Sequence, residues 1–233
     1  GYTYLTDADI CLNGYTVTLP NSDTGIRTGA NGYGILTDCT DKGTITGKRI
    51  FIENGGRIDL YSGTLNGTPI EINSSGGTFN MYGGKITGNE TTAVIGNNSN
   101  NKVYINMYGG EIRGNCVSVS AGAGVRIEEF GNFNMAGDAV IRENVSISTT
   151  DYGSRYGGGG GVYVYGKFTM SEHAKIEYNR AERGDGGGVL VNSVGTFKMI
   201  GGSNYTIAID DNYARDNGGG VYMDGTFEIS GGV

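Results

Sequence analysis

Short segments in which apolar and polar residues alternate recur along most of the chain. A first motif has an aromatic or aliphatic residue, then a polar residue, then Met or an aliphatic residue. Its copies are Ile58-Asp59-Leu60, Phe79-Asn80-Met81, Ile105-Asn106-Met107, Phe133-Asn134-Met135, Phe168-Thr169-Met170, Phe197-Lys198-Met199 and Phe227-Glu228-Ile229. Their third positions lie 21, 26, 28, 35, 29 and 30 residues apart in turn. Such alternation predicts short strands whose neighbouring side chains point to opposite faces of a sheet.

Two further motifs recur in a fixed order relative to the first. An Ile-x-x-Asn motif follows the middle copies: Ile86 with Asn89, Ile112 with Asn115, Ile141 with Asn144, Ile176 with Asn179, and Ile209 with Asn212. Small-residue corners precede the later copies: Gly122-Ala123-Gly124-Val125, Gly159-Gly160-Gly161-Val162, Gly186-Gly187-Gly188-Val189 and Gly218-Gly219-Gly220-Val221. Three short strands per repeat of roughly 25–30 residues predict an all-β fold, a single-stranded right-handed parallel β-helix. A β-propeller blade would need four strands and roughly 40 residues, and the leucine pattern of leucine-rich repeats is missing.

The repeat also predicts the packing and the extent of the domain. We expect the Phe, Met, Ile and Val residues of the motifs to stack inward and the asparagines to form an internal ladder of side-chain amides. One β-helix domain is expected over residues 1–233, with an atypical segment at 1–47 and regular coils at 48–233. Extra length, as at 146–156, is expected at one corner. The abrupt ends predict a fragment of a longer chain.

Composition and charge narrow the possible partners. The 45 glycines, with only two prolines and no three-residue period, argue against collagen and proline-rich linkers. A net charge of −7 without any basic block argues against binding to nucleic acid or anionic lipid. No apolar run approaches the roughly 20 residues of a membrane span, and no signal peptide is visible. We expect no cofactor and no metal, because neither cysteine ligand spacing nor a calcium-binding Gly-Asp repeat occurs.

The succession of Gly triplet, Val-Tyr-Val and Phe-Thr-Met-Ser at Gly159–Ser171 resembles the repeats of adhesin-like right-handed β-helix proteins on bacterial and archaeal surfaces. These proteins belong to the pectate-lyase-like superfamily. The opening, with Ile10–Thr16, Leu36–Cys39 and Gly43–Gly47, is similar to such domains in Gram-positive surface proteins. The resemblance covers essentially the whole chain and implies a location outside the cell or attached to its wall. It is specific for fold and setting but not for activity.

Outward tyrosines are the candidate binding residues. Tyr61, Tyr82 and Tyr108 each follow the inward third residue of the first motif, so they should face outward in three adjacent coils. Tyr163 and Tyr222 should stack outward with Leu190 on another face. Flat aromatic faces edged by hydroxyls would suit sugar rings or a protein partner at the cell surface. The alternative is that these ladders only stabilise the sheet through cross-strand packing.

Of the three cysteines, Cys11 and Cys39 fall in the atypical first segment and Cys116 in a regular coil. A Cys11–Cys39 disulfide would close a loop of a size worth about 3–4 kcal/mol and would suit an oxidising exterior. The alternative is that all three are small buried apolar residues.

Catalysis is the less favoured prediction. Hydrolysis of a glycosidic bond would need two facing carboxylates about 5–10 Å apart. The pairs considered are Glu128 with Glu129, Asp210 with Asp211, and Asp38 with Asp41, all adjacent on a strand or near turns. Arg113 and Arg142 are expected at equivalent outward positions without a surrounding acid cluster, and His173 in an exposed turn. We therefore expect an extracellular adhesin-like module that binds glycan or protein or acts as a rigid stalk. The alternative is a polysaccharide lyase or glycoside hydrolase.

Overall fold

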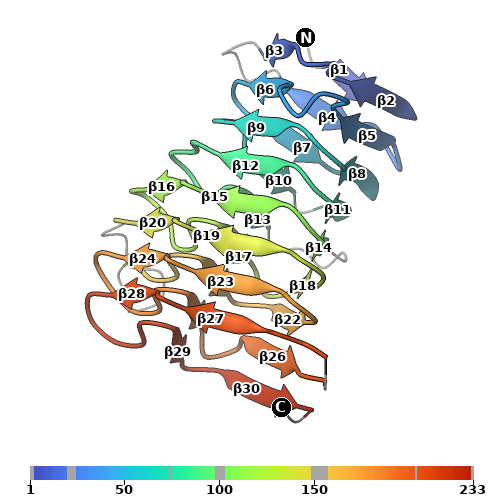
Figure 1. The fold of residues 1–233 in the computed structure, drawn as a ribbon. Coiled ribbons are helices and arrows are strands. Elements are labelled where there is room, and N and C mark those ends of the chain that lie inside the picture. Colours follow the sequence, from blue (N-terminus) through green and yellow to red (C-terminus); the bar gives the residue numbers. More distant parts are fainter. Residues whose placement is uncertain are drawn as a thin grey trace.

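The computed structural model describes residues 3–19, 25–73, 75–97, 103–147, 157–202 and 204–231. These residues form stacked parallel sheets and contain no helix. Figure 1 shows the strands of successive coils following one another from one end of the solenoid to the other. The predicted right-handed parallel β-helix with three main strands per coil is confirmed. In the described part of the chain, no helix has the length and apolarity that a membrane span requires.

Three long sheets form the walls of the solenoid, and every strand pairs in parallel with its equivalents in the adjacent coils. Sheet A contains β1 (Thr3–Leu5), β4 (Ile26–Thr28), β7 (Ile50–Ile52), β10 (Ile70–Ile72), β13 (Val94–Gly96), β17 (Val125–Ile127), β21 (Val162–Val164), β25 (Val189–Val191) and β29 (Val221–Met223). Sheet B contains β2 (Ala8–Cys11), β5 (Tyr33–Thr37), β8 (Gly56–Leu60), β11 (Gly77–Met81), β14 (Val103–Met107), β18 (Gly131–Met135), β22 (Lys167–Ser171), β26 (Thr196–Ile200) and β30 (Thr226–Ser230). Sheet C contains β3 (Thr16–Thr18), β6 (Thr44–Thr46), β9 (Thr64–Asn66), β12 (Lys85–Thr87), β15 (Glu111–Arg113), β19 (Val140–Arg142), β23 (Lys175–Glu177) and β27 (Ala208–Asp210).

A fourth, short sheet was not predicted. Sheet D joins β16 (Cys116–Val117), β20 (Val145–Ser146), β24 (Arg180–Ala181) and β28 (Tyr213–Ala214). Each strand of sheet D starts directly after the asparagine of an Ile-x-x-Asn motif. In these later coils the chain therefore forms an extra strand between sheet C and sheet A, which the described parts of the earlier coils lack. The segment 1–47, expected to be atypical, contributes β1–β6 to the same three long sheets. Residues 148–156, most of the expected corner insertion, lie outside the described residues.

The interior is built from the apolar positions of the three motifs. Phe133 and Phe168 stack with ring centroids 4.7 Å apart, and Phe168 stacks on Phe197 at the same distance. This spacing equals the separation of neighbouring strands in a sheet, so each ring covers its equivalent in the next coil. Phe79, Phe133, Phe168 and Phe197 are all fully buried. The predicted inward stack is confirmed.

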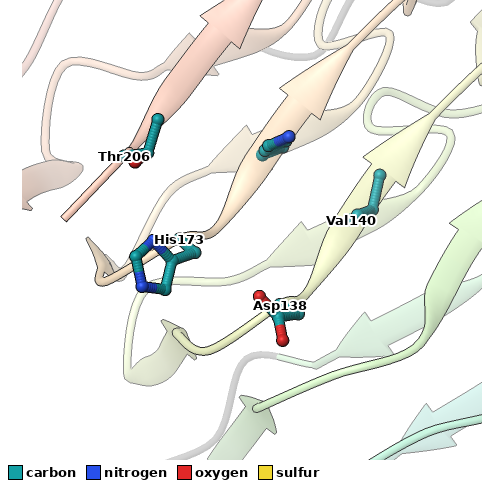
Figure 2. Close-up of a pocket in the computed structure, with 5 residues that line it drawn as sticks. Asp138, Val140, His173 and Thr206 are labelled. Carbon is teal, nitrogen blue, oxygen red and sulfur yellow. The ribbon is translucent and has the colours of Figure 1, made fainter. Parts of the chain in front are cut away.

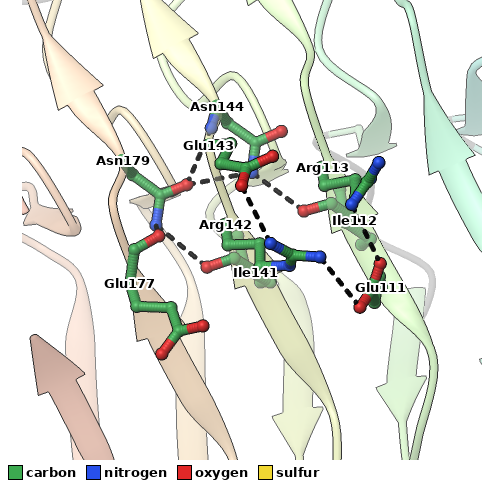
Figure 3. Close-up of polar contacts among 9 residues, drawn as sticks. All are labelled: Glu111, Ile112, Arg113, Ile141, Arg142, Glu143, Asn144, Glu177 and Asn179. Carbon is green, nitrogen blue, oxygen red and sulfur yellow. Dashed lines mark hydrogen bonds and ion pairs between the residues drawn. The ribbon is translucent and has the colours of Figure 1, made fainter.

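The predicted asparagine ladder is also present. From Asn89 through Asn115, Asn144 and Asn179 to Asn212, each Nδ2 donates to Oδ1 of the next asparagine at 2.8–3.0 Å. Each backbone N–H donates to the same oxygen, and later ladder amides also donate to an isoleucine carbonyl of the preceding coil, as Asn144 and Asn179 do (Figure 3). The ladder therefore satisfies the backbone groups that each turn leaves open inside the solenoid.

Candidate functional site

The outer face of sheet B carries a column of three stacked tyrosines. β8, β11 and β14 pair in register, so Leu60, Met81 and Met107 point inward and the residues that follow them point outward. The rings of Tyr61 and Tyr82 lie 4.7 Å apart, and those of Tyr82 and Tyr108 lie 5.4 Å apart. The three side chains are 46%, 38% and 44% exposed. The predicted outward stack is confirmed, and we call it the tyrosine column.

The column does not present a row of flat faces. The ring planes are inclined by only 14° and 20°, so the faces of adjacent rings cover one another. Solvent therefore meets the ring edges and the hydroxyls. The two end faces have no aromatic neighbour in the next coil: Tyr61 is followed by Thr37 on one side, and Tyr108 by Ala136 on the other. The expectation of several open aromatic faces is wrong, because the spacing of adjacent coils equals the stacking distance of aromatic rings.

The central tyrosine of the column, Tyr82, keeps its hydroxyl proton at neutral pH. Burial, together with the negative charge of Asp59, raises the pKa of Tyr82 above its ordinary value. A phenol with a raised pKa stays protonated at neutral pH and can donate a hydrogen bond to an acceptor above the column.

A column of amides runs beside the tyrosines and was not predicted as a unit. Asn80 donates to Asp59 at 2.7 Å, Asn106 donates to Asn80 at 2.8 Å, and Asn134 donates to Asn106 at 2.8 Å. The signal was present in the sequence, because the middle residue of the first motif is Asp or Asn in four consecutive copies. These hydrogen bonds fix the outer face of sheet B next to the tyrosine rings.

Asp59 anchors the amide column. Its side chain is fully buried, and it accepts hydrogen bonds from Arg57 Nε at 2.8 Å and from the Tyr33 hydroxyl at 2.9 Å. Burial alone would raise the pKa of Asp59, but the bonds from Arg57, Asn80 and Tyr33 outweigh it and lower the pKa. Burial and the bond to Asp59 raise the pKa of Tyr33 to about 12. Asp59 therefore stays ionised and fully bonded, which fits a structural anchor and not a general acid.

A glycine-lined trough lies directly beyond the tyrosine column. Its lining includes Gly63, Gly83, Gly84 and Gly110, which follow the three tyrosines within one or two residues, and its volume is about 470 Å³. A Cβ on Gly83 would lie 2.3 Å from the carbonyl oxygen of Tyr61, so stacked coils leave no room for a side chain here. Asp41, Lys85 and Glu111 supply charged groups along the trough, and Thr64 adds a hydroxyl. The trough therefore combines a floor of backbone with polar groups beside aromatic edges.

Tyr163 and Tyr222 do not belong to this surface. They stack in register with Leu190, as predicted, but Tyr163 is only 4% exposed. Tyr163 and Leu190 form a second buried cluster with Ala121, against which Tyr222 packs half-buried. A Cβ on Gly158 would lie 2.1 Å from Leu190 Cδ1, so the glycine-rich corner folds directly over this outer face. The expectation that Tyr163 offers an exposed ring is wrong for that reason.

His173 lines a separate pocket of about 300 Å³ together with Asp138, Val140, Lys175 and Thr206. Figure 2 shows His173 and Asp138 on neighbouring turns at the ends of their strands. His173 is exposed, as expected, and meets Tyr205 edge-on with ring centroids 6.2 Å apart. Asp138 is the one carboxylate among the described residues of this lining, so it does not supply the carboxylate pair that glycoside hydrolysis requires.

One carboxylate of each pair considered for catalysis has a structural partner. Asp38 accepts four backbone N–H bonds, from Gly14, Thr40, Lys42 and Gly43. The carboxylate of Glu128 pairs with Arg126, and Asp210 caps the backbone N–H of Asp211 at 3.0 Å. These groups hold turns and strands in place.

Arg113 and Arg142 lie side by side in register, as predicted. Glu111 pairs with both guanidinium groups, at 3.8 Å and 3.2 Å, and Glu143 pairs with Arg142 at 2.8 Å (Figure 3). Glu111 shares strand β15 with Arg113 and also reaches Arg142 in the next coil, and Glu143 directly follows Arg142 in the chain. Each arginine is held as one half of an ion pair, which does not favour a role as a catalytic base.

Comparisons with known proteins do not assign this chain to a family. No family model, no curated protein and no solved structure matches it significantly. The residues themselves therefore carry any functional conclusion.

Proposed function

We propose that this chain is a β-helix module of an extracellular surface protein, and that it binds glycan along the tyrosine column and the adjoining trough. The carrying observation is that three half-exposed tyrosines border a continuous polar trough across successive coils. Most ligand pockets have volumes of about 300–1,000 Å³ and combine apolar walls with a few polar groups. The trough, at about 470 Å³, lies within this range of volume, and its glycine floor and polar side chains suit a hydroxyl-rich ligand.

The dimensions favour an extended ligand. The lining residues Asp41, Gly63, Gly84 and Gly110 come from four successive coils. At about 4.8 Å per coil, these positions span roughly 14 Å along the solenoid. An oligosaccharide of a few sugar units would fit this length, with its hydroxyls bonded to Asp41, Lys85 and Glu111 and to the tyrosine hydroxyls.

One ring position is specifically suited to a sugar. The face of Tyr108 that points to the next coil is followed by Ala136, which is too small to cover an aromatic ring. A pyranose ring could therefore stack on Tyr108 above Ala136, while the ring edges of Tyr82 and Tyr61 border the rest of the ligand. Because the three tyrosine rings already stack on one another in the free protein, binding would cost little ordering entropy.

A carbohydrate-active enzyme is the second candidate, and the pocket of His173 and Asp138 is the observation that favours it. An exposed imidazole near a carboxylate could assist proton transfer to a bound glycan. Loss of any cleavage in His173→Ala would identify this pocket as the place of reaction.

A glycan-array screen of the purified chain, followed by product analysis of each retained glycan after prolonged incubation, separates these functions. Retention without cleavage supports the binding module. Cleavage supports the enzyme and would overturn the first proposal. If the chain neither retains nor cleaves any glycan, the proposal of glycan binding is overturned as well. A rigid stalk or a module for a protein partner would then be left.

A further inference from the structure

Cys11 and Cys39 meet at the corner where sheet B ends in the first two coils. Cys11 is the last residue of β2 and lies opposite Thr37, the last residue of β5. Cys39 follows two residues later, and the Sγ atoms of the two cysteines lie 3.0 Å apart. Both side chains are exposed, so the expectation of buried apolar cysteines is wrong for this pair.

The turn that carries Cys39 is fixed on both sides. The Asp38 carboxylate accepts a hydrogen bond from Gly14 N–H at 2.6 Å, which ties the turn to the first coil. The Ser62 hydroxyl donates to the Asp38 carbonyl at 2.8 Å and accepts from the Asp38 N–H at 2.6 Å, which ties it to the third coil. Asp38 also accepts from Lys42 and Gly43 within its own turn, each at 2.9 Å. The two thiols are therefore held together by the folded backbone.

We propose that Cys11 and Cys39 form a disulfide that joins the first coil to the second. A bonded pair of sulfurs lies about 2.05 Å apart, so the thiols need to approach by only about 1 Å. The exposed sulfurs are accessible to an oxidant, and the two residues are 28 positions apart in sequence, so the bond closes a long loop.

The two thiols have opposite pKa shifts. The hydrogen bond that they share and a bond from the Asn13 backbone N–H lower the pKa of Cys11, whereas the contact with Cys11 raises the pKa of Cys39. The lower pKa favours Cys11 as the first thiol to react. With a disulfide oxidant such as oxidised glutathione, the Cys11 thiolate forms a mixed disulfide and releases one glutathione thiolate. The deprotonated Cys39 then attacks Cys11 Sγ and releases the second. Two electrons pass to the oxidant, and the two cysteine protons end on the released glutathiones.

The test uses the whole chain, reduced and then equilibrated with oxidised glutathione under native conditions. Remaining thiols are alkylated in denaturant, and the protein is digested without reductant for mass mapping. We expect a linked Cys11–Cys39 peptide, two hydrogens lighter than the two separate peptides, and Cys116 free of that link. Separate glutathione adducts on Cys11 and Cys39, or a link from either of them to Cys116, would overturn the proposal.

Variants make the assignment specific. The Cys116→Ser variant should still give the linked peptide. Its melting temperature should be higher when it is oxidised, and added reductant should reverse this increase. Cys39→Ser should stop at a glutathione adduct on Cys11 without any internal link. Oxidation of the denatured protein is the matched control. If the three cysteines pair at random in denaturant but Cys11 pairs with Cys39 in the native protein, the folded turn selects this pair. An unchanged mixture of pairings in the native and denatured reactions would contradict this selection.

Discussion

Asn144 donates its side-chain amide to Oδ1 of Asn179 in the next coil at 2.9 Å, and its backbone N–H donates to the same oxygen at 3.1 Å. The two residues are 35 positions apart in sequence and both fully buried. One side chain thus satisfies two donors of the preceding coil. The same contact recurs from Asn89 to Asn212 and keeps the turns of successive coils in register. From Asn115 onward, these turns lie between the strands of sheet C and those of sheet D.

Replacing Asn144 should therefore be costly. Asn144→Ala leaves two donors of Asn115 and the carbonyl of Ile112 without their partner inside the solenoid. We expect the free energy of unfolding to fall by about 3 kcal/mol or more, measured by chemical denaturation. Asn134→Ala is the matched control, because it removes one amide bond at an exposed position and should cost less than about 1 kcal/mol. Equal losses would contradict the internal role of the ladder.

The start of the ladder can be extended. Among the described residues, Oδ1 of Asn89 is buried without a hydrogen-bond partner. Thr68 occupies the equivalent place one coil earlier, and its hydroxyl donates to the Ile45 carbonyl at 3.3 Å as a ladder amide would. We expect Thr68→Asn to raise the free energy of unfolding by about 1 kcal/mol by donating to Asn89. The same substitution in an Asn89→Ala background should give no such gain, and an equal gain there would refute this mechanism.

The residue before each ladder asparagine needs a left-handed backbone. Gly88 and Gly114 have φ of +66° and +63°, and Glu143, Tyr178 and Asp211 adopt φ of +50° to +56° at the same place. Gly114→Ala should cost about 1 kcal/mol, because the nearest atom to an added Cβ is 3.3 Å away and the backbone strain is the main penalty. Gly114→Asn should cost less, since Asn tolerates this conformation. A higher denaturation midpoint for Gly114→Ala than for Gly114→Asn would contradict this explanation.

Asp38 should make the N-terminal coils sensitive to acid. Burial alone would raise its pKa, but hydrogen bonds from Gly43, Gly14, Thr40 and Lys42 lower the pKa to about 2. An unfolded aspartate has a pKa of about 3.9, so the stabilisation is present above pH 4 and is lost as the pH falls toward 2. We expect Asp38→Asn to lose stability at pH 6 and to show a shallower further loss between pH 4 and pH 2. Asp41→Asn, at an exposed neighbouring position, is the control, and an identical acid profile for Asp38→Asn and the wild type would contradict the prediction.

Most of the fold could be predicted, because equivalent positions of successive sequence repeats pair with one another in adjacent coils. The Phe133, Phe168 and Phe197 stack and the ladder from Asn89 to Asn212 follow from equivalent positions alone. The tyrosine column could be placed outward in the same way. Its ring orientation could not, because the direction of a side chain on the outer face depends on its neighbours and not on the repeat.

The remaining differences arise where one part of the surface covers another. Tyr163 occupies an outward position of sheet A, yet the corner at Gly158 closes over that face. The trough was not visible in the sequence because its polar groups, Asp41, Lys85 and Glu111, come from three coils. The contact of Cys11 with Cys39 depends on the turn that Asp38 organises, which no repeat motif marks.

The tyrosine column is tested most directly by the affinity of a glycan retained on the array, measured by calorimetric titration of wild type and of the Tyr82→Ser, Tyr108→Ser double variant. Tyr15→Ser is the matched control, because Tyr15 is 71% exposed and lies outside the column. Melting temperatures of all three proteins establish that each is folded at the temperature of titration. We predict at least a tenfold loss of affinity in the double variant and wild-type affinity in Tyr15→Ser. Unchanged affinity in a folded double variant, with only its stability reduced, would show that the column packs the sheet surface and does not bind the glycan.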